Sequence, residues 1–157
     1  MSQEIKRICL WSGPRNISTA LMYAFAQRAD TKVVDEPLYG FYLNETEAKD
    51  YHPGAKETMA EMELNGEKVV AKMMADKSSS VFFFKNMAHH LLDLDRSFLK
   101  DAVNVILTRQ PKDAILSFSK VIKNPTLLDL GYEIQLNLKQ ELQKMGAKYL
   151  VINSREI

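Results

Sequence analysis

The stretch Ile8-Cys9-Leu10-Trp11-Ser12-Gly13-Pro14-Arg15-Asn16-Ile17-Ser18-Thr19 decides the fold of this chain. It predicts a short buried strand, a glycine-proline turn that carries Arg15, and a helix that begins near Ser18. The first N–H groups of such a helix have no partner within the helix, and the positive end of the helix dipole lies beside them. The turn can therefore hold an anion, and Arg15 adds a full charge. A plain strand-to-helix corner, with Ser18 capping the helix, is the alternative explanation.

This turn differs from the ATP-binding P-loop. The P-loop pattern G-x-x-x-x-G-K-[ST] needs a lysine directly before the hydroxyl residue, because the lysine reaches the outer phosphates and the hydroxyl binds magnesium. Here Ile17 precedes Ser18, and no lysine lies in the turn. The turn therefore favours an anion that is held by arginine and backbone amides, and we expect no metal.

Length and composition predict one domain with one sizeable core, which spans residues 1–157. The chain has 46% apolar residues and a formal net charge of +1, which disfavours a protein that coats nucleic acid. Its only cysteine, Cys9, excludes a disulfide framework and favours a reducing compartment. No apolar run approaches the roughly 20 residues that cross a bilayer, and no signal-type segment precedes the first strand. We therefore expect a cytoplasmic protein with no nucleic-acid and no membrane partner.

Strand and helix patterns alternate along the chain. Buried or β-branched runs predict strands at residues 8–12, 31–35, 81–85, 102–108 and 148–152. Helical patterns follow Ser18 and Pro111 and cover residues 55–64, 67–75 and 132–144, with Ile115, Phe118 and Ile122 as the apolar stripe after Pro111. The alternation predicts a three-layer α/β sandwich with a central parallel sheet. Because a binding loop and a covering helix would be expected after the last strand, we expect the chain to be truncated at its C-terminus.

Two stretches together resemble the nucleotide motifs of sulfotransferases that use 3'-phosphoadenosine 5'-phosphosulfate, namely residues 12–19 and 109–117. In that family Pro-[Lys/Arg]-Ser-Gly-[Ser/Thr]-Thr binds the 5'-phosphosulfate, and an arginine with a serine eight residues later holds the 3'-phosphate. The likeness covers roughly residues 7–152 and is strong for bacterial sulfotransferase-like proteins with Ser-Gly-Pro-Arg-Asn-x-Ser-Thr and Asp-Glu-Pro-Leu-Tyr. It implies a P-loop nucleotide-hydrolase-like fold. It also implies that the co-substrate is bound by Arg15, Asn16, Ile17, Ser18, Thr19, Arg109 and Ser117.

The first motif departs from the family at Ile17, where the family has glycine. A β-branched residue disfavours positive φ. If the loop needs that conformation here, the grip on the sulfuryl end is compromised, whereas a helical residue at this position loses nothing. The sequence leaves both outcomes open.

The resemblance also implies an in-line transfer of a sulfuryl group to a hydroxyl, with protein cations in place of magnesium. Arg15 is the candidate cation for the leaving oxygens, and Lys85 is a second one. A general base must take the proton of the acceptor hydroxyl, and Glu36, His89 and His90 are the candidates.

The family patterns favour Glu36 as this base. Many sulfotransferases carry a Lys-x-His pattern after a central strand, but Met87 occupies the histidine position here. In bacterial trehalose sulfotransferases a Glu-Pro pair after the second strand supplies the base, and Glu36-Pro37 resembles it. We therefore rank Glu36 first and His89 second.

Two other function classes stay open. Val33-Val34-Asp35-Glu36 could be a Walker-B-like strand of a magnesium-dependent P-loop kinase, although the missing loop lysine argues against it. A non-catalytic nucleotide-binding module is the other alternative, for which Ile17 and Met87 are the arguments. We expect a small-molecule acceptor, and the aromatic residues of segment 38–51 are compatible with stacking a sugar or an aromatic ring. The sequence leaves the oligomeric state, including a homo-oligomer, open.

Overall fold

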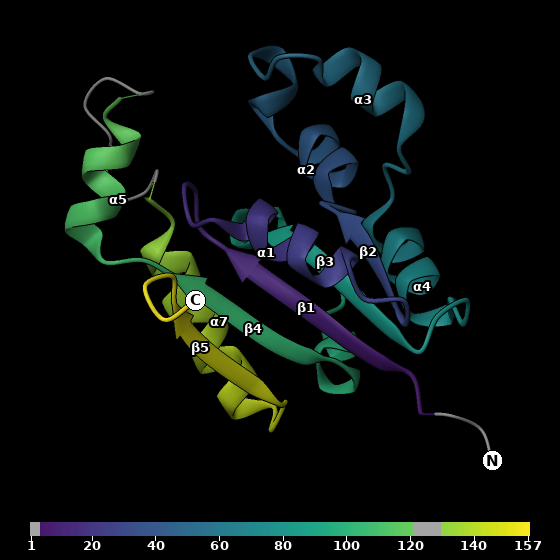
Figure 1. The fold of residues 1–157 in the computed structure, drawn as a ribbon. Coiled ribbons are helices and arrows are strands. Elements are labelled where there is room, and N and C mark those ends of the chain that lie inside the picture. Colours follow the sequence, from purple (N-terminus) through teal and green to yellow (C-terminus); the bar gives the residue numbers. More distant parts are fainter. Residues whose placement is uncertain (1–3, 121–129) are drawn as a thin grey trace.

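A five-stranded parallel sheet forms the centre of the computed structural model, which describes residues 4–120 and 130–157 (Figure 1). The strand order is β2-β3-β1-β4-β5, and all four pairings are parallel. The strands are β1 (Lys6–Ser12), β2 (Thr31–Asp35), β3 (Val81–Met87), β4 (Val103–Thr108) and β5 (Tyr149–Asn153). The predicted parallel sheet is therefore confirmed.

Helices cover both faces of the sheet, which confirms the three layers. Helix α1 (Ser18–Ala26) packs on one face, and α4 (Gly66–Ala75) and α7 (Tyr132–Lys144) pack on the other. Figure 1 shows α2 (Tyr39–Glu45), α3 (Ala55–Glu61) and α5 (Pro111–Phe118) at the end of the sheet to which the strand arrows point. Three short 3-10 helices complete the described chain, η1 (Glu47–Asp50), η2 (Ala88–His90) and η3 (Ser97–Asp101).

Alternating residues of the strands fill two separate cores. Cys9, Trp11 and Phe84 face the α4 and α7 layer, whereas Leu10 and Phe83 face α1. The central strands are thus buried on both faces, which explains why they appear in the sequence as continuous apolar runs. No helix in the described part of the chain is long and apolar enough to span a bilayer.

Several sequence predictions need correction, among them the helix expected over residues 55–64, which ends at Glu61 because Met62 is already extended. Strand β3 runs to Met87, two residues beyond the expected end, because Asn86 and Met87 continue the register with β1. The apolar stripe expected on α5 is wrong at Ile115, which is 40% exposed, while Ala114 is buried. Helix α5 projects beyond the sheet in Figure 1, so the elements of residues 4–120 and 130–157 cover only part of its surface. Ile122 lies outside the described residues.

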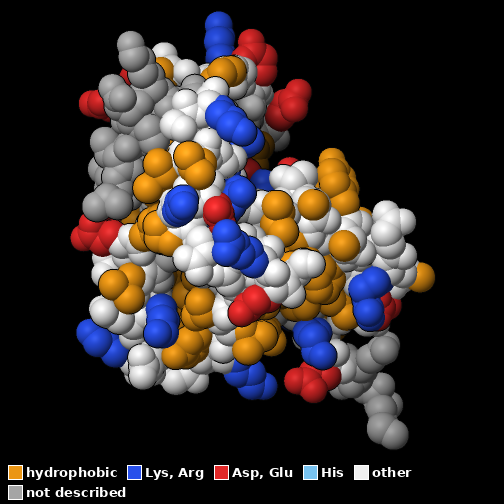
Figure 2. Space-filling view, turned by 60° about the vertical axis from the view of Figure 1, so that its left-hand side comes forward, with side chains coloured by type: hydrophobic (Ala, Val, Ile, Leu, Met, Phe, Trp, Pro, Cys, Tyr) orange, Lys and Arg blue, Asp and Glu red, His pale blue; other side chains and the backbone are white. Residues whose placement is uncertain are grey.

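Figure 2 shows one face of the molecule, with lysine and arginine side chains interspersed among acidic and apolar ones. This distribution matches the near-neutral net charge of +1.

Candidate functional site

One hollow brings the two predicted anion motifs together. It has a volume of about 360 Å³ and is lined by the residues that the sequence assigned to the nucleotide: Arg15, Asn16, Ile17, Ser18, Thr19, Arg109 and Ser117. The first five span the end of the β1–α1 loop and the start of α1, Arg109 directly follows β4, and Ser117 lies near the end of α5. Because β1 and β4 are neighbouring parallel strands, their carboxyl ends bring both motifs to the same edge of the sheet.

Two arginines connect the motifs directly. The Nη1 atom of Arg109 donates a hydrogen bond to the Arg15 carbonyl oxygen over 2.7 Å, and Nε of Arg15 donates to Ser117 Oγ over 3.2 Å. The Tyr132 hydroxyl donates in turn to the Arg109 carbonyl oxygen over 2.8 Å. A guanidinium group carries five N–H donors, so each arginine keeps donors for an anion in the hollow.

The Asn16 side chain points into the protein rather than toward the hollow. It is buried, and its Nδ2 atom donates to the Leu107 carbonyl oxygen over 2.9 Å. Gln135 of α7 donates to the same oxygen over 2.8 Å and to the Trp11 carbonyl oxygen over 3.3 Å. These two amides hold the ends of β1 and β4 together beneath the loop. Asn16 therefore offers its backbone, not its side chain, to a ligand.

The sequence analysis missed Gln135. Its position in the sequence could have identified it, because Gln135 lies at helical spacing from Leu138 and Leu142 on one face of α7. All three side chains are buried. A polar side chain on the buried face of a helix needs a hydrogen-bonding partner inside the protein.

Helix α1 begins without a side-chain cap, so Ser18 is not the cap that the alternative explanation required. Ile17 holds the N-cap position with φ 49° and ψ 15°, and its side chain makes no capping hydrogen bond. Ser18 is instead the first helical residue. Ser18 and Thr19 of this first turn line the hollow, which therefore lies at a helix start, as an anion site of this kind requires.

Backbone strain is concentrated at this site. Among residues 4–120 and 130–157, the non-glycine residues with positive φ are Arg15 (61°), Ile17 (49°) and Glu36 (43°). The loop thus needs the left-handed conformation where the sulfotransferase motif has glycine, and it adopts this conformation despite the β-branched side chain. Such a residue costs roughly 1–3 kcal/mol and persists only where its surroundings hold it.

Replacing Ile17 by glycine should raise the free energy of unfolding by about 0.5–1 kcal/mol, because glycine adopts positive φ without a steric cost. The Ile17 side chain is 45% exposed, so little apolar burial is lost. Urea denaturation measures the change. Thr19→Gly, two residues later inside α1, is the matched control and should lower stability, since glycine is unfavourable in a helix. A loss of stability in Ile17→Gly would show that the conformation carries no strain.

A buried lysine lies between two carboxylates at the end of β2. The Lys85 side chain is 6% exposed, and its Nζ atom is 3.0 Å from Asp35 Oδ1 and directly paired with Glu36 Oε1. The Glu36 N–H also donates to the Lys85 carbonyl oxygen over 2.7 Å. Burial by itself disfavours the ammonium form, but the hydrogen bonds and charges of Glu36 and Asp35 outweigh it and raise the pKa of Lys85. Glu36, which the sequence favoured as the base, and Lys85, the second candidate cation, are therefore ion-paired with each other.

The three histidines pack together with tyrosines from α2. The His90 ring stacks on Tyr42 and Tyr39 at centroid distances of 4.7 and 5.2 Å, and His52 Nδ1 lies 2.7 Å from the Tyr39 hydroxyl. Burial, with a smaller contribution from His52, lowers the pKa of His89 to about 4, and burial lowers the pKa of His90 further. Both histidines are therefore weaker bases here than an ordinary histidine.

The buried His90 and the partly buried His89 should make the protein sensitive to mild acid. Their folded pKa values lie below the ordinary value, so the native state binds fewer protons, and stability is complete above about pH 6.5 and falls as the pH drops toward 4. We expect a loss of about 2–4 kcal/mol between about pH 7 and pH 5, measured by urea denaturation. His90→Phe keeps an aromatic ring against Tyr39 and Tyr42 but cannot titrate. Its free energy of unfolding should therefore fall less between about pH 7 and pH 5 than that of the wild type. An equal loss in His90→Phe and wild type would contradict this role for His90.

The fold and the hollow define a class of protein. A parallel sheet whose first strand leads through an anion-suited turn into a helix is the architecture of the P-loop nucleotide-hydrolase-like domains. Solved structures agree: shikimate kinase from Bacteroides thetaiotaomicron matches with a TM-score of 0.50 at 17% identity, over 95% of this chain and 86% of that one. A sulfotransferase from Alicyclobacillus acidocaldarius matches with the same TM-score at 13% identity, over 94% of this chain and 73% of that one.

The family within this class follows from the sequence. Residues 6–153 match the family described as "Sulfotransferase domain", and the chain belongs to that family. Two Arabidopsis thaliana proteins, named branched-chain-amino-acid aminotransferase-like proteins 1 and 2, are 38% and 34% identical over 149 residues, which are 94% of this chain. The chain spans 26% of the length of each. The suspected family is therefore confirmed.

Proposed function

We propose that this domain transfers a sulfuryl group from 3'-phosphoadenosine 5'-phosphosulfate to a hydroxyl of a small molecule. The observation that carries the proposal is the hollow in which both expected nucleotide motifs, with two arginines and the first turn of α1, line the same space. Membership of the sulfotransferase-domain family supports the proposal. The acceptor itself stays unidentified.

The two motifs that line the hollow would hold the two charged groups of this donor. The backbone amides of residues 16–19 and the Arg15 side chain would hold the 5'-phosphosulfate, and Arg109 with Ser117 would hold the 3'-phosphate. Charge-assisted hydrogen bonds from guanidinium and backbone N–H groups are the strong contacts available for such anions. Asn16 takes part through its backbone, because its side chain is bonded to Leu107.

The proposed reaction is an in-line displacement at sulfur. The acceptor oxygen forms a bond to sulfur while the bond from sulfur to the bridging phosphate oxygen breaks, and 3',5'-ADP leaves. The acceptor proton passes to a Glu36 carboxylate oxygen. Arg15 and Lys85 stabilise the charge on the moving group and the leaving oxygen, and a sulfuryl group carries less charge than a phosphoryl group, so side chains can replace magnesium.

A P-loop kinase is the second candidate, because shikimate kinase shares the fold. Two features disfavour it. The loop lacks the lysine that a P-loop needs before its hydroxyl residue. The carboxylates of the Walker-B-like strand, Asp35 and Glu36, are both paired with Lys85. A non-catalytic module of the same fold differs from both enzymes in having no turnover.

A nucleotide titration tests the proposal. If Arg109 and Ser117 hold a 3'-phosphate, contacts worth about 1.5–3 kcal/mol each should make 3',5'-ADP bind at least roughly tenfold more tightly than 5'-ADP, without magnesium. Calorimetry on the wild-type protein measures both affinities and that of ATP with magnesium. Tighter binding of magnesium-ATP would reject the sulfotransferase proposal in favour of the kinase.

Variants assign the preference to the second motif. Ser117→Ala should reduce the preference for 3',5'-ADP, and Arg109→Ala should abolish it. Because Arg109 also donates to the Arg15 carbonyl oxygen, its loss is expected to weaken 5'-ADP slightly as well. Arg28→Ala removes a surface arginine that pairs with Asp30 and is the matched control, with no expected effect on either nucleotide. A full preference retained in Arg109→Ala would place the 3'-phosphate elsewhere.

A further inference from the structure

We infer that Asp35 is a positioning residue that keeps Lys85 charged and in place while Glu36 carries the proton of the acceptor. From the sequence, Asp35 was assigned only to the Walker-B-like strand of the kinase alternative and had no role in sulfuryl transfer. The catalytic part of the inference rests on the proposed function, whereas the effect of Asp35 on Lys85 can be measured without any turnover.

The sheet itself sets the geometry of this group. Asp35 and Lys85 are register partners on the neighbouring parallel strands β2 and β3, so their side chains point to the same face, which is the α1 face that Val33 and Phe83 also occupy. The Lys85 ammonium reaches both Asp35 and, one residue later, Glu36. Glu36 has left the strand with φ 43°, yet its N–H stays bonded to the Lys85 carbonyl oxygen. The lysine is thus held from two directions.

The three side chains differ in their access to solvent. The Lys85 side chain is 6% exposed, that of Glu36 26% and that of Asp35 55%. The Glu36 and Asp35 carboxylates are therefore accessible to a ligand or to water, whereas the ammonium depends on the protein for its partners. A buried ammonium without a carboxylate partner is strongly disfavoured.

Two carboxylates beside Lys85 keep its charge compensated even after one of them has taken a proton. At rest the group holds two carboxylates and one ammonium. When the acceptor oxygen bonds to sulfur, its proton moves to Glu36, which becomes neutral and no longer compensates Lys85. At that moment charge develops on the leaving oxygen, and a cation is needed nearby. Asp35 then remains as the one carboxylate beside the ammonium, so Lys85 keeps its proton and its position.

Other titratable groups around Lys85 do not offer a substitute for Asp35. Within the described residues, the groups facing it are Asp35 and Glu36 at the end of β2 and His90 from η2, while Tyr39 from α2 faces Glu36. His90 is neutral near pH 7, because burial and the neighbouring positive charges lower its pKa. The negative charge that can replace Glu36 comes from Asp35.

The first experiment follows the ionisation of Lys85 by NMR of its side-chain carbon next to the ammonium. Glu36→Gln imitates the protonated base. With Asp35 present, Lys85 should titrate within about one pH unit of the wild-type value, whereas in the double variant Asp35→Asn/Glu36→Gln its pKa should fall by at least about two units. An equal fall in Glu36→Gln alone would show that Asp35 does not hold the charge and would overturn the inference.

The second experiment measures the reaction with water as the acceptor, as release of 3',5'-ADP from 3'-phosphoadenosine 5'-phosphosulfate. Asp35→Asn should lower the maximal rate about tenfold and move the alkaline limb of the pH–rate profile to lower pH, since Lys85 then loses its proton more easily. Asp35→Glu should restore most of the rate and the profile. Donor binding, measured by calorimetry, should change little in either variant.

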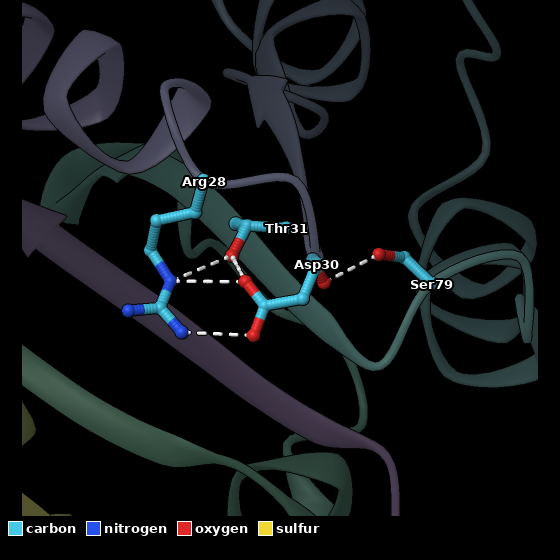
Figure 3. Close-up of polar contacts among 4 residues, drawn as sticks. All are labelled: Arg28, Asp30, Thr31 and Ser79. Carbon is cyan, nitrogen blue, oxygen red and sulfur yellow. Dashed lines mark hydrogen bonds and ion pairs between the residues drawn. The ribbon is translucent and has the colours of Figure 1, made fainter.

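The matched control lies at the other end of the same strand. Asp30 directly precedes β2 and pairs with Arg28 through two hydrogen bonds, beside Thr31 and Ser79 (Figure 3). Asp30→Asn therefore removes an exposed aspartate–cation pair of similar chemistry and should leave the rate and the pH profile unchanged. Thermal melting of all variants confirms that they are folded.

The outcomes separate the inference from the proposed function. A wild-type protein that transfers no sulfuryl group would refute the proposed function, and the Lys85 titration would still decide whether Asp35 holds the lysine. A normal rate and an unchanged pH profile in Asp35→Asn would overturn the catalytic part of the inference. Loss of rate with an unchanged pH profile would make Asp35 merely structural.

Discussion

Replacing Glu36 by glutamine should lower kcat about 10²–10⁴-fold while the affinity for 3',5'-ADP changes less than about twofold. The amide keeps the shape of the side chain and an oxygen that can accept the Lys85 hydrogen bond. It cannot take the proton of the acceptor hydroxyl. The effect should therefore fall on the chemical step, because the nucleotide motifs that line the hollow do not include Glu36.

The choice of acceptor provides the sharpest control for this prediction. A nitrophenol that is already ionised has no proton to give up, so Glu36→Gln should transfer sulfuryl to it nearly as well as the wild type, if the site admits it as an acceptor. The rate of sulfuryl transfer to water, in contrast, should fall by the whole factor of about 10²–10⁴. A near-normal rate with water in Glu36→Gln, together with an inactive His89→Ala protein, would instead assign the base to His89.

Much of the fold could be predicted because the strands of a doubly covered parallel sheet have a simple pattern. Residues 81–84 are apolar without interruption, and β3 is buried on both faces, as such a run requires. The helix over residues 132–144 was predicted with its bounds, since Leu138 and Leu142 lie at helical spacing and Gly146 follows with φ 68°. Helix α5 was the exception, because spacing alone does not show whether a neighbouring element covers the stripe that contains Ile115.

The candidate site was predictable only in part. The loop and the strand-end arginine lie in short motifs, and parallel strands bring such motifs to one edge of the sheet. The contacts that shape the site depend on register and backbone conformation instead. Neither the pairing of Asp35 with Lys85 nor the bond from Arg109 to the Arg15 carbonyl can be inferred from spacing, and the left-handed conformation of Ile17 runs against its residue type.

Replacing Arg15 by alanine should abolish measurable turnover of the donor, a loss of at least about 10³-fold, and leave the fold intact. The size is that expected when a cation that stabilises transferring charge is removed, as for arginine residues in phosphoryl transfer. The fold should survive because Arg15 is exposed and its side-chain bond, to Ser117 Oγ, lies at the surface. Arginine and alanine also face a similar steric cost at φ 61°, so the substitution adds no backbone strain.

Turnover, nucleotide binding and urea denaturation together decide what Arg15 does. Arg15→Lys keeps the charge but not the planar, two-donor geometry, so it should recover part of the lost rate. Arg28→Ala, at an exposed arginine that precedes β2, should change none of the three measurements. Unfolding of Arg15→Ala would make Arg15 a structural residue that holds the two motifs together through Ser117. A folded Arg15→Ala protein with normal turnover would instead show that the loop amides and Lys85 stabilise the leaving group without it, because no other side chain of residues 16–19 carries a charge.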